Sequence, residues 1–215
     1  MRTTANRVLL GAALLVATAG ANADTFNGTN TGPIPPAPAG APNCGVNNLG
    51  PAREVLFDVS GLSINVLSVN VLMNLDHDWR GDLVVRLEAP GGTPNMVLFS
   101  HTGSNVPTGC GHGGDLLGEY EFTDDTLRDW WGSAFTVVPA NKYRTSAPGG
   151  TDPGGQPTLL NSVFRGLTPA QANGTWKLII QDAGDADDGT IISAKLVIDQ
   201  TDVIFKNGFE TPTTP

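Results

Sequence analysis

The sequence predicts an all-β protein, a sandwich or barrel of short strands. Three observations predict this fold class. Apolar residues recur at every second position in several segments, which is the period of a half-buried strand. Turns rich in Gly and Pro separate those segments. Only residues 124–131 have a pattern compatible with a helical turn.

The first 23 residues have the features of a secretory signal peptide. Arg2 and Arg7 precede and flank an apolar run over residues 8–16, and Ala21-Asn22-Ala23 fits the small-residue cleavage pattern. The apolar run is too short to span a bilayer, and we find no other segment apolar enough to do so. We therefore expect an exported protein, secreted or at the cell surface.

Composition and charge narrow the classes of partner. The net charge is −9, and removal of the two signal-peptide arginines makes it −11. An acidic chain without a Lys/Arg cluster argues against nucleic acid and anionic membranes, and is compatible with cations such as calcium. The 27 Gly and 16 Pro residues, in a chain that is 40% hydrophobic, indicate a loop-rich globular domain.

The elements of the first half follow in order. Residues 24–42, rich in Pro, Gly and Thr, predict an extended linker or N-terminal arm. Alternating apolar residues then predict strands over residues 53–61, 64–77, 82–89 and 95–100, with a turn at 90–93.

The second half is less regular. Residues 101–160 are rich in glycine and predicted to be irregular, with Asp124 or Asp125 as a cap for the helical turn at 124–131. Strands are predicted over residues 175–182 and 190–199, joined by a turn at 183–189. One domain over residues 43–201 and a C-terminal tail over 202–215 complete the prediction.

The two cysteines, Cys44 and Cys110, predict a disulfide because an even number in an exported protein favours pairing. The alternative is a metal site built from Cys110, His112 and His101. Their spacing fits no usual zinc pattern, so the disulfide is favoured.

Three segments together resemble the P domain, or P/Homo B domain, of proprotein convertases and subtilisin-like proteases. They are HDWRGDLVVRLEAPGGTPNMVLFS, GHGGDLLGEYEFTDDT and LLNSVFRGLTPAQANGTWKLIIQDAGDADDGTIISAKLVI. The resemblance extends over about residues 50–200 and implies a jelly-roll-like β-sandwich of about eight strands. It implies structural roles for Gly81, Asp82, Gly174, Trp176 and Gly189.

The P domain of convertases follows a catalytic domain, which it stabilises, and it can influence calcium and pH behaviour. This chain contains no Asp, His and Ser in subtilase sequence contexts and no Gly-x-Ser-x-Gly. We therefore expect no catalysis and no catalytic residues, although the family is associated with serine endopeptidases.

A calcium site is a further hypothesis. Asp182, Asp185, Asp187 and Asp188 lie within seven residues, and calcium takes six to eight oxygen ligands. The segment does not fit an EF-hand. The alternative is a solvated turn between two strands, in which Asp and Gly are common.

The tripeptide Arg80-Gly81-Asp82 has the sequence of an adhesion motif. In the resembled domain, Gly81 permits a close backbone turn and Asp82 is expected to accept backbone N–H groups at the start of a strand. Only Arg80 is left without a structural role. We therefore interpret the tripeptide as part of the fold.

Tryptophans offer binding surfaces as well as core residues. Trp176 alternates with apolar neighbours and is predicted to be buried. Trp130 and Trp131 cannot both face inward, so one could stack on a sugar or a protein, or cap the sandwich.

We expect a non-catalytic protein-interaction or stabilising module, with an extracellular partner such as a protease. The alternative is a carbohydrate- or matrix-binding module.

Overall fold

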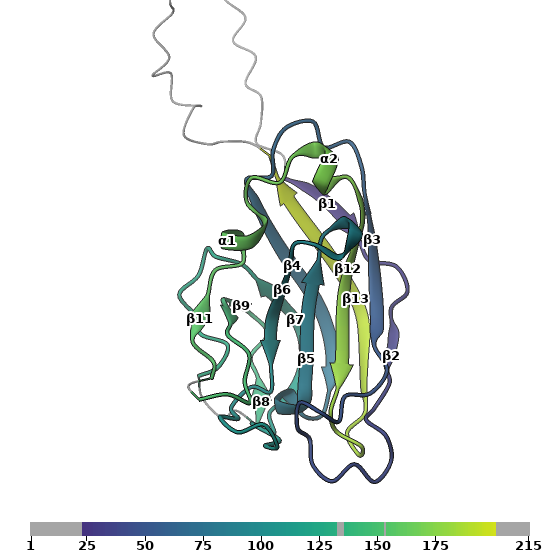
Figure 1. Cartoon of the computed structure of the whole chain (residues 1–215), viewed down its shortest axis with the longest axis vertical. Coiled ribbons are helices and arrows are strands. Elements are labelled where there is room, and N and C mark those ends of the chain that lie inside the picture. Colours follow the sequence, from purple (N-terminus) through teal and green to yellow (C-terminus); the bar gives the residue numbers. More distant parts are fainter. Residues whose placement is uncertain (1–22, 133–135, 153, 201–215) are drawn as a thin grey trace, which may run out of the picture.

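The computed structural model describes residues 23–132, 136–152 and 154–200. In these ranges the chain forms two β-sheets packed face to face, with short helices and glycine-rich loops at the edges and ends (Figure 1). The predicted all-β, jelly-roll-like sandwich is thereby confirmed. The predicted signal peptide, apart from Ala23, and the predicted tail lie outside the described residues.

The first sheet has seven strands in the described residues. Its central path runs β1-β13-β4-β7-β8, with β2 also paired to β13 and β9 to β7. The strands are β1 (Asp24–Asn27), β2 (Gly32–Ile34), β4 (Ser68–His77), β7 (Asp115–Phe122), β8 (Val137–Val138), β9 (Lys142–Tyr143) and β13 (Gly189–Asp199). All pairs are antiparallel except those of β7 with β8 and β9.

The second sheet has four antiparallel strands in the order β3-β12-β5-β6. They are β3 (Arg53–Val59), β12 (Gly174–Asp182), β5 (Leu83–Glu88) and β6 (Asn95–Ser100). Strands β10 (Thr145–Ser146) and β11 (Pro157–Thr158) form a separate pair. The described residues thus contain 13 strands, more than the predicted eight or so, because six of them have only two to four residues.

The core lies between the two sheets and follows from the period-two pattern. On β4, residues Val69, Val71, Met73 and Leu75 point inward and are fully buried. Trp176 on β12 is also fully buried, packs against Phe164 with ring centroids 5.3 Å apart, and donates from Nε1 to the carbonyl of Ala172. The predicted inward positions are therefore the positions that exclude water.

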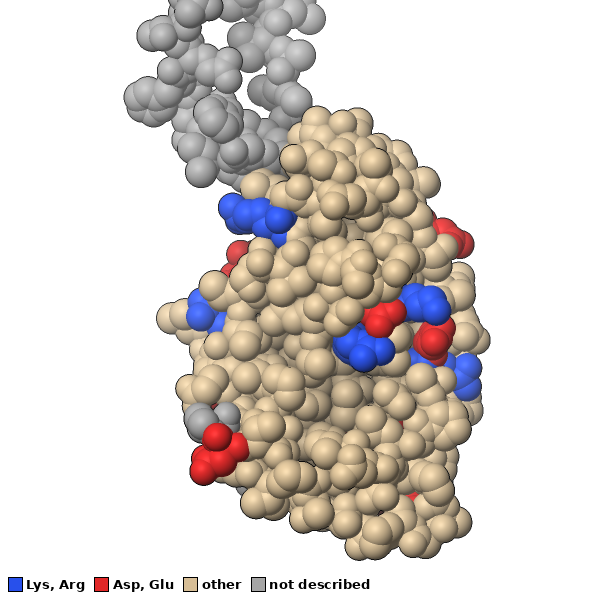
Figure 2. Space-filling view, in the orientation of Figure 1, with Lys and Arg blue, Asp and Glu red and all other residues tan. Residues whose placement is uncertain are grey.

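The outward positions of the second sheet carry paired charges. Arg86 Nη2 lies 2.9 Å from Glu88 Oε1, and Lys177 Nζ lies 2.8 Å from Glu54 Oε2. Figure 2 shows positively and negatively charged side chains gathered near the middle of this face, with largely uncharged surface around them. Each pair is exposed enough to contribute little to stability.

The segment predicted as a linker belongs partly to the first sheet. Strand β1 pairs with β13 from Asp24 opposite Ile198 to Asn27 opposite Lys195, and β2 pairs with the start of β13. These short strands provide partners for the backbone groups of β13, which would otherwise form an open edge. An extended arm is therefore the correct description of their conformation, and a free linker is not.

The middle of the chain is more ordered than its sequence predicts. Strand β7 lies in the predicted irregular region, with Leu116, Tyr120 and Phe122 buried. The short helices are η1 (Arg80–Asp82), η2 (Pro90–Gly92), α1 (Asn161–Phe164) and α2 (Pro169–Ala172). Residues 124–131 form no helix. Asp124 instead accepts the N–H groups of Leu160 and Asn161 at the start of α1.

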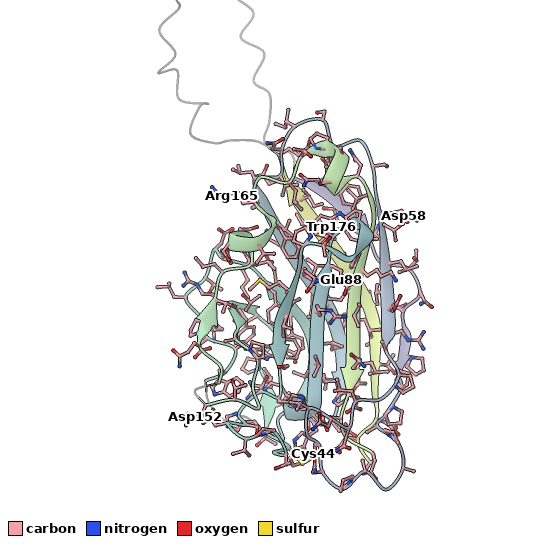
Figure 3. All side chains as sticks on the ribbon, in the orientation of Figure 1. Cys44, Asp58, Glu88, Asp152, Arg165 and Trp176 are labelled. Atoms are coloured by element: carbon pink, nitrogen blue, oxygen red, sulfur yellow. A yellow bond between two sulfur atoms is a disulfide. The ribbon has the colours of Figure 1, made fainter. Side chains whose placement is uncertain are left out.

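A disulfide joins Cys44 and Cys110, as predicted, across 66 residues of sequence. It lies at one end of the sandwich, where Figure 3 labels Cys44, far from Trp176 toward the other end. The metal alternative is excluded because both thiols are used in the bond.

We expect the double variant Cys44→Ser, Cys110→Ser to lose about 4 kcal/mol of unfolding free energy, the chain-entropy value for a loop of this length. Chemical denaturation of the variant and the native protein measures the difference. An unchanged denaturation midpoint would contradict this expectation.

We expect Asp124→Ala to lose about 1–2 kcal/mol, because two backbone N–H groups lose a charged acceptor. The neighbouring Asp125 is exposed, so Asp125→Ala is the matched control and should change stability by less than about 0.5 kcal/mol. Equal effects of the two substitutions would show that Asp124 has no special role.

Candidate functional site

The candidate site lies at the end of the sandwich where the connection from β4 to β5 meets two loops. The connection contains η1, which is the tripeptide Arg80-Gly81-Asp82, and all three residues are buried. An adhesion receptor needs an accessible tripeptide, so the adhesion hypothesis is excluded. The interpretation of this tripeptide as part of the fold is the correct one.

Gly81 is required by the close approach of another segment. A Cβ atom at this position would collide with the backbone of Cys110 and His112. The disulfide between Cys110 and Cys44 anchors the same segment. The turn and the residues after Cys110 therefore fit together only because position 81 has no side chain.

Arg80 has a structural role that the sequence analysis did not assign. Its Nη1 donates to the carbonyl of Trp130 at 3.0 Å, and its Nη2 lies 3.1 Å from His112 Nδ1. The guanidinium carbon lies 5.5 Å from the centroid of the Trp130 ring, within cation–π range. Burial lowers the pKa of Arg80, although nearby tyrosines and Asp129 oppose this effect.

Trp130 is the centre of an aromatic cluster at this end. It is fully buried and packs against the rings of Phe99, Phe122, Tyr120 and Tyr143. Its Nε1 donates to Thr102 Oγ1 at 3.0 Å. Of the two adjacent tryptophans, Trp130 is therefore the core residue, while Trp131 is half-buried beside a glycine-rich loop.

A second group of polar side chains lies beyond η1. His77, Asp82 and Asp182 are fully buried, and their potential ligand atoms lie within 4.8 Å of one another. His77 Nε2 lies 3.2 Å from Asp182 Oδ2, and its Nδ1 accepts the N–H of Trp79. Because Nδ1 is an acceptor, Nε2 carries the proton and donates to Asp182.

Asp82 differs from the sequence expectation. Neither of its buried carboxylate oxygens receives a hydrogen bond in the structure, whereas its backbone carbonyl accepts the N–H of Ala183. Burial, followed by the charges of Asp182 and Asp187, raises the pKa of Asp82 to about 9. The carboxyl of Asp187 is close enough to share a proton with it.

The four predicted calcium candidates have different surroundings. Asp182 is buried, and Asp187 is half-buried with a pKa raised by burial and then by Asp182. Asp185 is exposed and accepts the N–H of Gly40, and Asp188 is exposed beside a shallow groove. The structure thus brings two of the four together with Asp82, which was expected to accept backbone N–H groups at the start of a strand.

The shallow groove lies next to this cluster. It is lined by Arg53, by the carboxylate residues Asp76, Asp78 and Asp188, and by the proline-rich segment 33–36. No tryptophan lines it. The groove is acidic and open, and none of its features indicates a particular small ligand.

Two further glycines are required by their surroundings, one at the site and one away from it. At the site, a Cβ at Gly189 would collide with the ring of His77. Gly174 lies at the other end of β12, near Pro90, where its φ of +136° is one that other residues rarely adopt. The two remaining histidines are also in structural settings. Burial lowers the pKa of His101, and burial followed by the charge of Arg80 lowers the pKa of His112.

The architecture and the site define the class of protein: an all-β module whose polar groups at one end hold a turn and two loops together. The family model described as the proprotein convertase P-domain matches residues 66–110, which include β4, η1, β5 and β6. This match confirms the resemblance that the motifs indicate.

Two solved structures resemble the chain. One is the serine protease of Aeromonas sobria in complex with a chaperone, at 16% identity and a TM-score of 0.42, and the other is the same organism's serine protease, at 14% and 0.40. Each alignment covers 84% of this chain and 26% of the other, so the chain spans about a quarter of their length. No curated protein sequence matches the chain.

Among the residues that the structure describes, none of the helices has the length and hydropathy needed to cross a membrane.

We expect Arg80→Ala to lower the unfolding free energy by about 3 kcal/mol or more, because it leaves a cavity against Trp130 and removes its hydrogen bonds. Arg128, an exposed arginine whose guanidinium carbon lies 5.8 Å from the Tyr143 ring centroid, provides the control. Arg128→Ala should cost less than about 1 kcal/mol. Thermal or chemical unfolding of the two variants measures the difference. If Arg80→Ala lost no more unfolding free energy than Arg128→Ala, the structural role of Arg80 would be contradicted.

Proposed function

We propose that this chain is a non-catalytic accessory module that acts outside the cytoplasm by binding and stabilising another protein. The leading candidate partner is a secreted serine protease of the subtilisin type. The observation that carries the proposal is the match of residues 66–110 to the P-domain model, since P domains accompany serine proteases without performing the catalysis.

The chemistry of the site supports a structural module. His77 donates to a buried carboxylate, and His112 contacts a buried guanidinium. His101 is buried, which disfavours the protonated form. The three histidines, which are the side chains that could serve as general bases, are thus part of the packing at this end of the sandwich.

Export is part of the same proposal. A disulfide persists in oxidising compartments, which fits the predicted signal peptide. Strand β1 begins at Asp24, directly after the predicted cleavage site. Cleavage there would leave every described strand complete.

The outer face of the second sheet is a suitable surface for a partner. Four of its charged side chains form two ion pairs, and much of the surrounding surface is uncharged (Figure 2). Depletion of unpaired charge is a property of the central part of protein–protein interfaces. Half-buried Leu56 and Val84 point outward on this face and add apolar area.

The alternative is binding of a carbohydrate or matrix component. It rests on the half-buried Trp131, since Trp130 is fully buried and unable to stack on a sugar. Glycan-array binding that is lost in Trp131→Ala, together with no effect on any protease, would favour this alternative.

We expect the protein to slow the thermal inactivation of a subtilisin-like serine protease secreted by the same cells. Purified protease is heated with and without a molar excess of the protein, and its residual activity is followed with a fluorogenic peptide. The protein alone should not cleave the peptide. An unchanged inactivation rate with no detectable binding would contradict the proposal.

Two half-buried lysines, one on each outer face, distinguish the faces of the sandwich. Lys177 lies on the second sheet and Lys195 on the first, and each faces a glutamate. If the partner docks on the second sheet, Lys177→Glu should weaken binding about tenfold or more, while Lys195→Glu leaves it nearly unchanged. The opposite result would place the interface on the first sheet.

A further inference from the structure

Three carboxylates converge at the tip of the β12–β13 connection. If Gly184 carried a Cβ atom, that atom would collide with Asp82 Oδ2, and it would lie 3.1 Å from Asp187 Oδ2 and 3.2 Å from Asp182 Oδ1. Oxygens of three acidic side chains therefore surround one small region beside a residue without a side chain. Asp82 comes from the β4–β5 connection, and the other two come from the end of β12 and the loop after it.

Among the described residues, no lysine or arginine forms an ion pair with this cluster, and Asp182 accepts hydrogen bonds from His77 on Oδ2 and from the N–H of Gly184 on Oδ1. His77 is a neutral donor to Asp182, as its hydrogen bond with Trp79 shows. Arg80 is the first residue of η1, but its guanidinium points toward Trp130 and His112 and away from the carboxylates. Clustered carboxylates without a cation are unfavourable in a buried setting.

Asp82 provides the observation that points to a ligand. Its side chain is fully buried, and both of its oxygens are without a hydrogen-bond donor. Buried carboxylates in folded proteins normally accept hydrogen bonds or coordinate metals. The group that faces Asp82 is another carboxyl, that of Asp187, which supplies a donor only if one of the two is protonated.

The donor set selects the kind of ligand. All three converging groups are oxygen donors, which hard cations prefer. Calcium accommodates irregular coordination and accepts backbone carbonyls and water beside carboxylates. Asp187 is half-buried, so water can reach the cluster from the loop side. His77 is not a ligand, because its Nδ1 accepts the N–H of Trp79 and its Nε2 donates to Asp182. It serves as a positioning residue for Asp182.

We propose that Asp82, Asp182 and Asp187 bind one calcium ion that joins η1 to the β12–β13 loop. Asp185 and Asp188, which lie in the same loop, are not ligands of this ion. Both are exposed, and neither contributes one of the oxygens nearest to Gly184. The ion holds η1, which lies in the β4–β5 connection, against the loop that joins β12 to β13. This proposal does not depend on the identity of a protein partner.

The experiment uses protein stripped of metal with a chelator and then titrated with calcium chloride. Isothermal titration calorimetry should show one site, and the unfolding temperature should rise by about 5–10 °C when free calcium exceeds the dissociation constant a hundredfold. Magnesium chloride at the same concentration should give a smaller shift. Absence of both heat and a temperature shift with calcium would overturn the proposal.

Asp82→Asn is the decisive variant. It should weaken calcium binding at least tenfold. In metal-free protein the variant should unfold at the same temperature as the native chain or higher, since it replaces a buried carboxyl group that receives no hydrogen bond. If Asp82 instead shares a structural proton with Asp187, the metal-free variant should unfold at a lower temperature than the native protein. In that case calcium should change neither the heat signal nor the unfolding temperature of the native protein.

Asp185→Asn and Asp187→Asn test the ligand set within one loop. Asp187→Asn should weaken calcium binding, and Asp185→Asn should leave the dissociation constant within about twofold of the native value. Equal loss of binding in both variants would overturn the assignment of ligands and indicate a diffuse acidic loop.

Discussion

The buried guanidinium of Arg80 is the interaction on which this end of the sandwich depends. It contacts the face of Trp130, donates to the carbonyl of the same residue and lies within hydrogen-bond distance of His112. These contacts connect the β4–β5 turn with the loop that follows Cys110 and with the aromatic cluster between the sheets. Burying a charge is unfavourable unless its hydrogen bonds are satisfied, so the surrounding segments have little freedom to move away.

Two neighbouring features follow from this constraint. Gly81 must lack a side chain because the backbone at Cys110 and His112 lies directly against it. The disulfide restrains the same segment, and the adjacent Asp82 is directed to the opposite side of the turn, toward Asp182 and Asp187. The three-residue helix η1 therefore carries a buried guanidinium that contacts Trp130 and His112 and, two residues later, a buried carboxyl near Asp182 and Asp187. All three residues of Arg80-Gly81-Asp82 are buried.

The sequence predicted the parts of this structure that depend on local pattern. Strands β3, β4, β5, β6, β12 and β13 follow from alternating apolar residues, and the disulfide follows from two cysteines in an exported chain. Strand β7 was missed because Gly118 and the exposed Leu117 obscure its alternation. The helical turn at 124–131 was wrong because Asp124 caps a helix 36 residues away. The convergence of Asp82 on Asp182 depends on long-range pairing of β5 with β12, which no local pattern reveals.

The proposed module and the proposed ion both rest on a rigid end of the sandwich around Arg80. Amide hydrogen exchange measures that rigidity directly, because the N–H of Arg80 donates to Gly114, that of His112 to Thr102 and that of Ala183 to Asp82. We expect these three amides to be protected nearly as strongly as those of the central strands β5 and β12. Exchange as fast as that of an exposed turn such as η2, under conditions where β5 and β12 remain protected, would contradict it.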